Sequence, residues 1–253
     1  MTKDTSPIPL YGLSLEEGQD INVGPYAWKT EVDLSTLGVP YELKGKTFAQ
    51  IRGEFEKETG NPKVSVPTLQ TEDGWITDSW TIAEYKYGTP ERSLFAGGEA
   101  LNRFINTWVD KDLFGALVPL FAPWLYQAQN AESSAWFLKQ KLGGDKSKID
   151  ALIAASKDDA WVDQTAAAAR GTLGTLEKHL AALKAAGKGP FIAGTDYPTH
   201  ADSDVFGWYG ASAAVRPYDL LAKVWHHEDL PLVSEWAKKV VEVSGVNAPK
   251  YPY

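Results

Sequence analysis

Residues 64–87 read VSVPTLQTEDGWITDSWTIAEYKY, and this stretch decides the expected fold. The short apolar runs Val64–Leu69 and Trp75–Thr77 predict two strands. The sequence Thr-Glu-Asp-Gly between them predicts the turn of a hairpin. A compact amphipathic stretch, Trp80–Tyr87, follows and predicts a helix. The order of two strands and a helix indicates a small sheet flanked by helices.

The residues before this stretch continue the same pattern. Ile8–Leu13 and Tyr41–Leu43 predict two more strands, and Pro25–Leu37 between them has apolar residues at helical spacing. The proline that begins this helix suits a first helical position, and Gly38 lies just past its end. The pattern of Thr47–Lys57 fits either a short helix or a loop.

Beyond residue 98 the sequence is almost purely helical in pattern. GTPERSLFAGG at 88–98 predicts an interdomain linker. Glu99–Gln129 predicts a long aromatic-rich helix that Pro119 and Pro123 kink or divide. Three further stretches predict helices, of which the first is rich in alanine: Lys148–Ala186, Ala201–Val215 and Pro231–Ser244.

The composition excludes several classes of function. The 253 residues carry 25 Lys and Arg against 33 Asp and Glu, a net charge of −8 that disfavours nucleic-acid binding. The chain has no cysteine, which excludes disulfides, thiolate metal sites and cysteine nucleophiles. Its four histidines, of which only His226 and His227 are adjacent, disfavour a histidine-based metal site. No apolar run approaches the roughly 18–20 residues of a membrane span. The first dozen residues also lack a signal peptide's apolar stretch, so we expect a cytoplasmic protein.

Two short motifs lie at element boundaries, where binding groups often sit. Pro67 cannot donate to a β-ladder, and a cis bond before it would expose the backbone of Val66 to a peptide-like ligand. The alternative is an ordinary edge-strand proline. Asp78 or Ser79 could cap the following helix. Alternatively, the start of this helix could bind a ligand's carboxylate while Asp78 meets its ammonium group.

The third motif is the loop Glu16–Pro25, with the sequence EEGQDINVGP. A junction of strand, loop and helix directs backbone N–H groups at a bound anion, such as a thiolate. Asn22 and Gly24 are the natural lining residues of such a site. Both residue types are also common in loops that have no binding role.

In this order and spacing, the motifs resemble those of cytosolic glutathione transferases. The segments PYAWKT at 25–30 and DSWTIAEY at 78–85 resemble the bacterial β-etherase-type transferases and the fungal transferases related to them. Thr199 and Asp202 fit the capping box that transferases place at the start of a core helix. The resemblance implies an α+β thioredoxin-like domain with a four-stranded mixed sheet (1–87), a linker (88–98) and an all-α helical-bundle domain (99–253).

The resemblance also implies that glutathione is the co-substrate and that no metal takes part. By matching positions, Val66 would bind the cysteinyl backbone, with a cis bond to Pro67. Asp78 and Ser79 would bind the γ-glutamyl head.

Two further subsites follow from the same resemblance. Lys63, or alternatively Lys46, would meet the glycyl carboxylate of glutathione. The helical domain would supply a hydrophobic acceptor site, although most aromatic residues on helices belong to a core. The aromatic candidates for that site are Trp108, Phe114, Phe121, Trp124 and Tyr126.

The group that activates the thiol is where this chain departs from the pattern. Etherase-type members have a serine immediately before the Pro-Tyr-x-Trp segment, and this chain has Gly24 there. Because the loop is about two residues longer, Asn22 could replace that serine, while Gly24 offers a backbone N–H. Either donor would stabilise a thiolate. Ser14 and Tyr11 are nearby hydroxyls, predicted to lie in or just past the first strand.

We therefore expect a homodimeric glutathione transferase of detoxification that conjugates glutathione to aromatic electrophiles or cleaves their ethers. The missing serine and the 10 Trp, 11 Tyr and 9 Phe favour an alternative, a low-turnover protein that scavenges aromatic or polyphenolic ligands. A third alternative is a structural protein that has lost glutathione, and the intact motifs around Pro67 and Asp78 argue against it.

Overall fold

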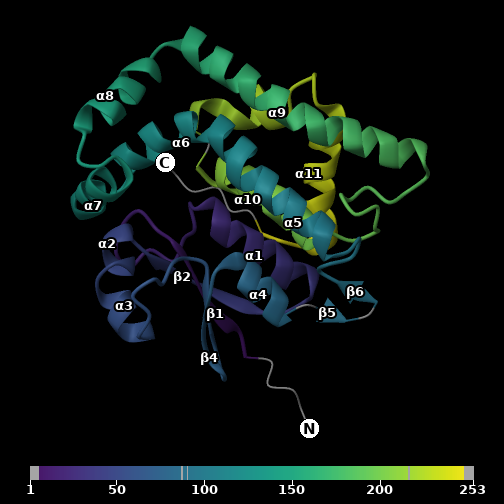
Figure 1. The fold of residues 1–253 in the computed structure, drawn as a ribbon, viewed down its shortest axis with the longest axis horizontal. Coiled ribbons are helices and arrows are strands. Elements are labelled where there is room, and N and C mark those ends of the chain that lie inside the picture. Colours follow the sequence, from purple (N-terminus) through teal and green to yellow (C-terminus); the bar gives the residue numbers. More distant parts are fainter. Residues whose placement is uncertain (1–5, 87, 90, 216, 248–253) are drawn as a thin grey trace.

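A four-stranded mixed sheet forms the centre of the first domain (Figure 1). The computed structural model describes residues 6–86, 88–89, 91–215 and 217–247, so the ends of the expected domain ranges (1–5, 87 and 248–253) lie outside the described residues. The strand order is β2-β1-β3-β4; β1 pairs parallel with β2 and antiparallel with β3, and β3 pairs antiparallel with β4. The strands are β1 (Ile8–Leu13), β2 (Tyr41–Lys46), β3 (Thr68–Thr71) and β4 (Gly74–Thr77).

Helices cover both faces of this sheet. They are α1 (Pro25–Thr36), α2 (Phe48–Ile51), α3 (Glu54–Thr59) and α4 (Ser79–Lys86). Successive side chains of a strand point to opposite faces. Leu10 of β1 packs with Leu34 of α1 and Ile82 of α4. The ring of the next residue, Tyr11, lies 4.8 Å from that of Phe55 in α3. The sheet therefore separates α1 and α4 from α3, which is the thioredoxin-like arrangement that was expected.

The structure corrects two expectations in this domain. The expected strand Val64–Leu69 is wrong in its first four residues, because β3 begins only at Thr68, after a proline that has no N–H for the ladder. The undecided stretch 47–57 contains the two short helices α2 and α3. Thr47 and Gln50 form a capping box at the start of α2, a signal that the sequence carries.

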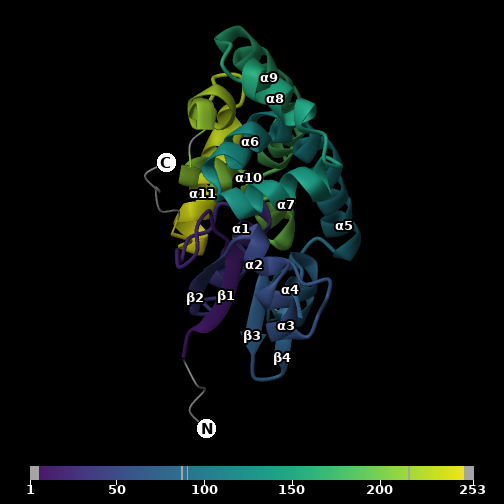
Figure 2. The ribbon, with the colours of Figure 1, turned by 90° about the vertical axis from the view of Figure 1, so that its left-hand side faces the viewer.

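The second domain is all-helical, and it lies above the sheet domain in Figure 2. All 16 residues of its central helix α10 are buried. The segment 88–98, expected as a plain linker, contains a hairpin of β5 (Gly88–Thr89) and β6 (Arg92–Ser93). The helices are α5 (Glu99–Trp108), α6 (Phe114–Ala128), α7 (Ala131–Lys141), α8 (Lys146–Ala155), α9 (Asp159–Ala185), α10 (His200–Val215) and α11 (Pro231–Ser244). Shorter helical turns are π-helical (Val109–Leu113 and Leu221–Trp225) or 3-10 (Pro217–Asp219).

Pro119 and Pro123 do not divide a helix as expected. Both lie inside α6, and the break between α5 and α6 is the π-helical turn Val109–Leu113. Each proline removes one backbone hydrogen bond. Tertiary packing overrides this loss, because α6 buries Pro123 itself together with Leu117, Leu120 and Phe121.

The two domains meet where α10 packs against α1. Glycines make this approach possible. A Cβ atom on Gly207 would lie 2.4 Å from the carbonyl oxygen of Pro25, and one on Gly210 would lie 2.7 Å from the ring of Trp28. The backbone of α10 therefore rests directly on the first turns of α1, and this contact sets how the domains are placed around the site.

Candidate active site

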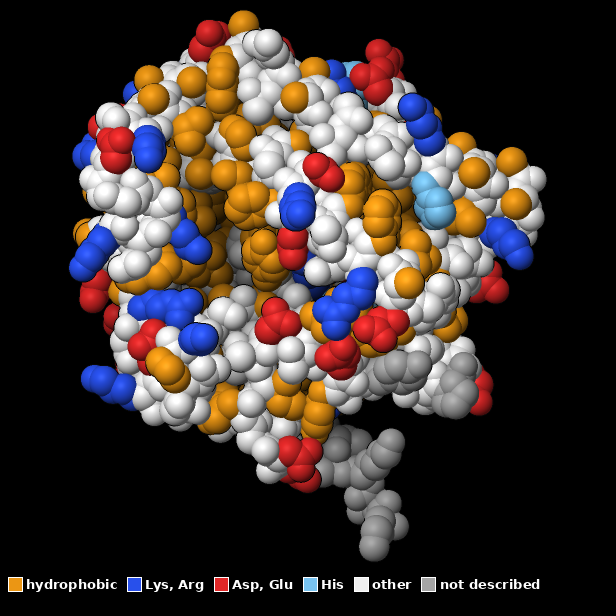
Figure 3. Space-filling view, viewed as in Figure 1, with side chains coloured by type: hydrophobic (Ala, Val, Ile, Leu, Met, Phe, Trp, Pro, Cys, Tyr) orange, Lys and Arg blue, Asp and Glu red, His pale blue; other side chains and the backbone are white. Residues whose placement is uncertain are grey.

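A cavity of about 670 Å³ lies between the two domains. Figure 3 shows this face of the molecule hollowed, with hydrophobic side chains gathered in the hollow. Its volume falls within the roughly 300–1,000 Å³ of small-molecule sites. The first domain contributes Leu13, Val23, Gly24, Pro25, Tyr26, Phe48, Ile51, Arg52, Ser65, Val66, Pro67, Asp78 and Ser79. The helical domain contributes Phe114, Val118, Phe121, Ala122, Leu125, Trp136, Phe137, Lys141, Leu142, Ile149, Leu152 and Trp208.

The Val66–Pro67 turn forms part of the cavity wall, and its peptide bond is cis, as the resemblance implied. Two threonines hold the turn in place. The hydroxyls of Thr68 and Thr77 donate to the carbonyl oxygen of Ser65 at 2.6 and 3.0 Å. The backbone N–H of Ser65 donates to the Thr77 hydroxyl oxygen at 3.2 Å. Val66 therefore lines the cavity from a segment that these hydrogen bonds anchor.

Asp78 and Ser79 line the same cavity at the start of α4. Asp78 caps this helix, because its Oδ1 accepts from the backbone N–H of Thr81 at 3.0 Å and from its hydroxyl at 3.2 Å. Asp78 has a φ of 82°, a left-handed conformation that Asp and Asn adopt more readily than most residues. Ser79 is only 4% exposed. Capping by Asp78, one of the two alternatives, is therefore confirmed, and its exposed carboxylate also lies on the cavity wall.

The structure corrects the expected donor role of Asn22. Its side chain is fully buried and lies outside the cavity lining formed by the described residues. Its Nδ2 donates to Oε1 of Glu31 at 2.8 Å, and its Oδ1 accepts from the backbone N–H of Gly24 at 2.9 Å. The two expected donors are therefore already engaged, the amide of Asn22 by Glu31 and the N–H of Gly24 by Asn22. Ser14 is buried as well and donates to the carbonyl of Glu16.

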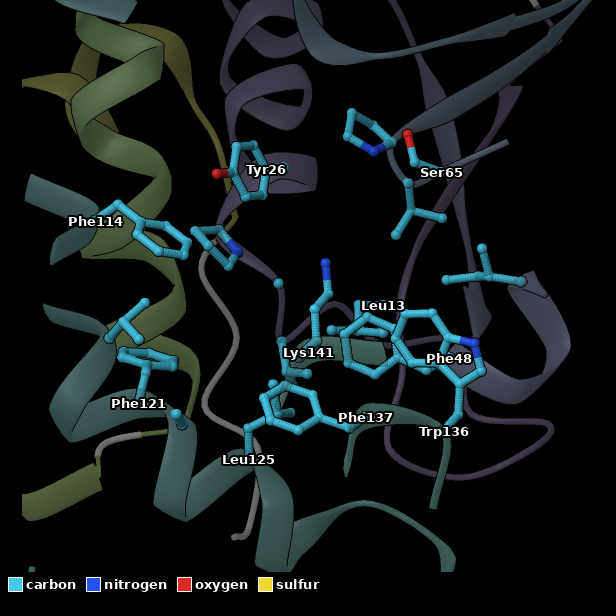
Figure 4. A pocket seen from close by; sticks show the side chains of 18 of the residues that line it. Leu13, Tyr26, Phe48, Ser65, Phe114, Phe121, Leu125, Trp136, Phe137 and Lys141 are labelled. Carbon is cyan, nitrogen blue, oxygen red and sulfur yellow. The ribbon is translucent and has the colours of Figure 1, made fainter. Parts of the chain in front are cut away.

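Tyr26 is a cavity-lining residue to which sequence reasoning assigned no role. Burial, followed by the charge of Asp110, raises the pKa of Tyr26 to about 12, so the hydroxyl stays protonated at neutral pH. Figure 4 shows Tyr26 beside Phe114, across the cavity from Ser65. No side chain caps α1 at Gly24. As in any α-helix, the N–H groups of the first turn have no intrahelical acceptor; here they begin after Pro25, which has none, and this positive end of the helix lies at the cavity.

The cations of the cavity differ from the expected ones. Lys63 is exposed and lies outside the lining among the described residues. The ammonium group of Lys46 lies 3.1 and 3.4 Å from two glutamates of α3. The basic residues that line the cavity are Arg52, at the end of α2, and Lys141, at the end of α7. Arg52 lies in the stretch 47–57, whose structure the sequence left undecided. The capping signal of Thr47 and Gln50 could have predicted the short helix that ends at Arg52.

The aromatic candidates of the acceptor site divide into two groups. Phe114 and Phe121 line the cavity. Trp108, Trp124 and Tyr126 lie outside the lining formed by the described residues, so these three are corrections. The position of each residue around its helix decides whether its side chain reaches the cavity, because residues of one helix point to different sides. The aromatic lining residues that sequence reasoning missed are Phe48, Trp136, Phe137 and Trp208.

The Thr199–Asp202 motif is a core support, and one half of the expected capping box is observed. Oδ2 of Asp202 accepts from the backbone N–H and the hydroxyl of Thr199, at 2.8 and 2.9 Å. Oδ1 accepts from the N–H of Ile192 and from the indole of Trp236. Burial raises the pKa of Asp202, and these four donors oppose that rise. The carboxylate joins three segments of the helical domain.

The described residues lack the features of two other kinds of site. They contain no group of three or more His, Cys, Asp or Glu side chains placed to hold a metal ion. No described helix is both long enough and apolar enough to cross a membrane.

Comparisons with known proteins add the family context. Residues 23–86 match the family model of the glutathione S-transferase N-terminal domain. A glutathione S-transferase of Ceriporiopsis subvermispora, solved in complex with glutathione, superposes with a TM-score of 0.72 at 21% identity, over 96% of this chain and 98% of that chain. A glutathione transferase from Phanerochaete chrysosporium gives 0.67 at 20% identity, with the same two shares. A glutathione S-transferase from Rhodospirillum rubrum gives 0.56 at 23% identity, over 92% and 87%. The chain therefore has the glutathione transferase fold.

Proposed function

We propose that this protein is a glutathione transferase that joins glutathione to hydrophobic aromatic electrophiles. One observation carries the proposal: three separate segments, the Val66–Pro67 turn, the start of α4 and the start of α1, line a single cavity. Together they offer a backbone edge for a peptide, a carboxylate beside a helix N-terminus, and a second helix N-terminus. The match of residues 23–86 to the transferase N-terminal model supports the same reading.

Each charged part of glutathione has a partner on the first domain. The backbone of Val66 pairs with the cysteinyl residue as an added strand would. Asp78 binds the ammonium group of the γ-glutamyl head, while Ser79 and the free N–H groups of α4 bind its carboxylate. Arg52, in place of Lys63, binds the glycyl carboxylate.

The sulfur then lies at the start of α1. A free thiol has a pKa of about 8.5, so catalysis at neutral pH requires that the thiolate be stabilised. The N–H groups that follow Pro25 in the first turn of α1 and the positive end of the helix provide this. The thiolate attacks an electrophilic carbon of an acceptor held by α6, α7, α8 and α10, and the leaving group departs.

A second candidate function is a glutathione-dependent ligand-binding protein with little turnover. The observation in its favour is that Gly24, which has no side chain, stands where etherase-type members have serine, while the amide of Asn22 donates to Glu31. Turnover with an aryl halide and with a β-aryl ether, beside displacement of a fluorescent aromatic dye, separates the two. Conjugation or ether cleavage supports the transferase, and tight dye displacement without turnover supports the binder.

The head-group assignment predicts distinct effects for Asp78→Asn and Ser79→Ala. Asparagine keeps the oxygen that caps Thr81 and tolerates the left-handed backbone, but it loses the charge that meets the ammonium group. We expect Asp78→Asn to weaken glutathione binding about tenfold or more while the unfolding free energy changes by less than about 0.5 kcal/mol. Ser79→Ala should weaken binding by about 1–2 kcal/mol. Isothermal calorimetry and urea unfolding measure both quantities.

A matched control is Asp73→Asn, because Asp73 is exposed and contacts Tyr85 outside the cavity. It should leave glutathione affinity unchanged. Equal affinities for the wild type, Asp78→Asn and Ser79→Ala would show that the head group does not bind at α4.

A further inference from the structure

The charged residues of the cavity are unequally paired. Among the described lining residues only Arg52, Asp78 and Lys141 carry a charge. Arg52 has Glu56 at 3.5 Å, and Asp78 is bonded to Thr81. Lys141 has no carboxylate within 4.0 Å in the described parts of the chain. Among the residues that the structure describes, it is therefore the one cation of this lining without an anionic partner of its own.

The structure directs Lys141 toward the cavity. It is the last residue of α7, and Figure 4 shows its side chain reaching in among the lining residues. Its ammonium nitrogen lies 5.9 Å from the ring centroid of Trp136, which is stacked on Phe48 of α2 at 5.1 Å. This aromatic pair joins the two domains at the cavity wall and gives the lysine a fixed neighbour. A lysine at a helix C-terminus also suits the helix dipole. However, Lys139 of the same last turn has that advantage without lining the cavity.

An apolar chamber adjoins this ammonium group. Leu125 of α6, Phe137 of α7 and Ile149 and Leu152 of α8 belong to the same lining. A ligand whose rings fill the chamber brings its polar end to Lys141. A charge facing an apolar, poorly hydrated space attracts an opposite charge more strongly than it would in bulk water.

We propose that the acceptor of this protein is an aromatic anion, whose carboxylate or sulfonate binds Lys141 while its rings occupy the chamber. Lys141 is then a specificity-determining residue for the second substrate. The inference rests on the proposed function, because the three charged groups of glutathione are assigned to Asp78, to the start of α4 and to Arg52, and this leaves Lys141 for the acceptor.

A pair of dyes tests this directly. Anilinonaphthalene sulfonate and phenylnaphthylamine share their aromatic body and differ by the sulfonate. We expect the wild type with saturating glutathione to bind the sulfonate more tightly, and Lys141→Met to weaken that binding about tenfold without changing the affinity for the neutral dye. Lys141→Arg should retain most of the affinity for the sulfonate. Lys139→Met is the matched control and should behave as the wild type.

Calorimetry with glutathione alone separates the possible failures. If Lys141→Met weakens glutathione and leaves both dyes unchanged, Lys141 serves the tripeptide and the inference is overturned while the proposed function stands. If both dyes weaken equally, or Lys139→Met matches Lys141→Met, the ammonium group does not select anions and the inference is overturned. If the wild type binds no glutathione, the proposed function fails and this inference fails with it.

Discussion

Glu31 is a buried carboxylate that holds the loop before α1. Its side chain is 3% exposed, and it accepts from Nδ2 of Asn22 at 2.8 Å and from the hydroxyl of Tyr41 at 3.1 Å. Burial raises the pKa of Glu31 to about 7, although both hydrogen bonds favour the charged form. Asn22 in turn holds the N–H of Gly24. The protonation of Glu31 therefore acts on the segment that borders the proposed sulfur position.

Replacing Glu31 by glutamine should remove a pH dependence of stability. The folded protein holds this proton more tightly than the unfolded chain, whose glutamate titrates near 4.5. Stability is therefore lost as pH rises from about 4.5 to about 7, by about 3 kcal/mol in all. We expect the free energy of unfolding of Glu31→Gln to lack this loss. The difference in this free energy between Glu31→Gln and the wild type should therefore favour the variant more at pH 8 than at pH 5. Urea unfolding at several pH values measures the difference.

Glu17→Gln is the control for this experiment, because Glu17 is exposed. Its stability should run parallel to that of the wild type. If Glu31→Gln and the wild type stay parallel across the range, Glu31 does not hold a proton in the folded state at these pH values.

The sequence predicts which residues lie at the site better than it predicts where their side chains point. Val66, Pro67, Asp78 and Ser79 all line one cavity, because turn and cap residues are tied to element boundaries that a sequence reveals. Asn22 lies in the correct loop, but its amide is directed by a glutamate nine residues later, on a helix face that the pattern does not identify as buried.

At the scale of elements, helix and strand starts were predicted best where a local signal exists. Pro25 begins α1 and Pro231 begins α11, as expected from the preference of proline for the first turn. Inside α6, by contrast, the two prolines led to a wrong prediction of a helix break, because packing of the surrounding turns keeps the helix intact. Local chemistry predicts where an element can begin, and tertiary contacts decide whether it continues.

The uncapped start of α1 predicts a gain from Gly24→Ser. Gly24 has an extended backbone that any residue can adopt, and a Cβ there would lie 3.0 Å from that of Leu13, so the strand must yield slightly. The new hydroxyl would add a donor beside the proposed thiolate. We expect the pKa of bound glutathione to fall by about one unit relative to Gly24→Ala, with faster conjugation. Ultraviolet absorbance of the thiolate, followed against pH, measures this.

Gly24→Ala is the matched control, because it introduces the same Cβ contact without a hydroxyl. Any cost of crowding Leu13 appears in both variants and cancels. Identical thiol pKa values in the two variants would mean that the sulfur does not lie at this end of α1.

At the scale of the whole molecule, buried charges join the two domains. The ammonium group of Lys29 in α1 lies 2.9 Å from Asp204 of α10. Nδ1 of His200 lies 2.7 Å from Asp33 of α1. Burial lowers the pKa of His200, but Asp33 and then Asp204 more than offset this, so its pKa lies above the usual value. The interface therefore favours the protonated imidazole.

Removing Asp33 should destabilise the protein as a unit. Asp33→Ala leaves His200 and the hydroxyl of Ser203, which donates to Asp33 at 2.6 Å, without that acceptor inside the interface. We expect a loss of about 3–5 kcal/mol. Because His200 has a raised pKa, the loss is largest at acid pH and shrinks as the imidazole loses its proton. Urea unfolding near pH 6 and at higher pH tests both statements.

Asp229→Ala provides the comparison, since it breaks an exposed pair with Arg170. Its cost should stay below about 1 kcal/mol. Equal losses for the two aspartates would mean that the interface charges contribute no more than surface charges do.

The glycine contacts of α10 restrict how this scaffold can be engineered. At Gly207 and Gly210 a Cβ atom would lie 2.4 Å from the carbonyl oxygen of Pro25 and 2.7 Å from the ring of Trp28, so α10 itself places no side chain at these two contacts. A chimera that pairs this first domain with a foreign helical domain must supply small residues at both places, or the halves are wedged apart. Libraries that aim to enlarge the pocket are better directed at α7 and α8, whose lining side chains can be shortened without disturbing that seam.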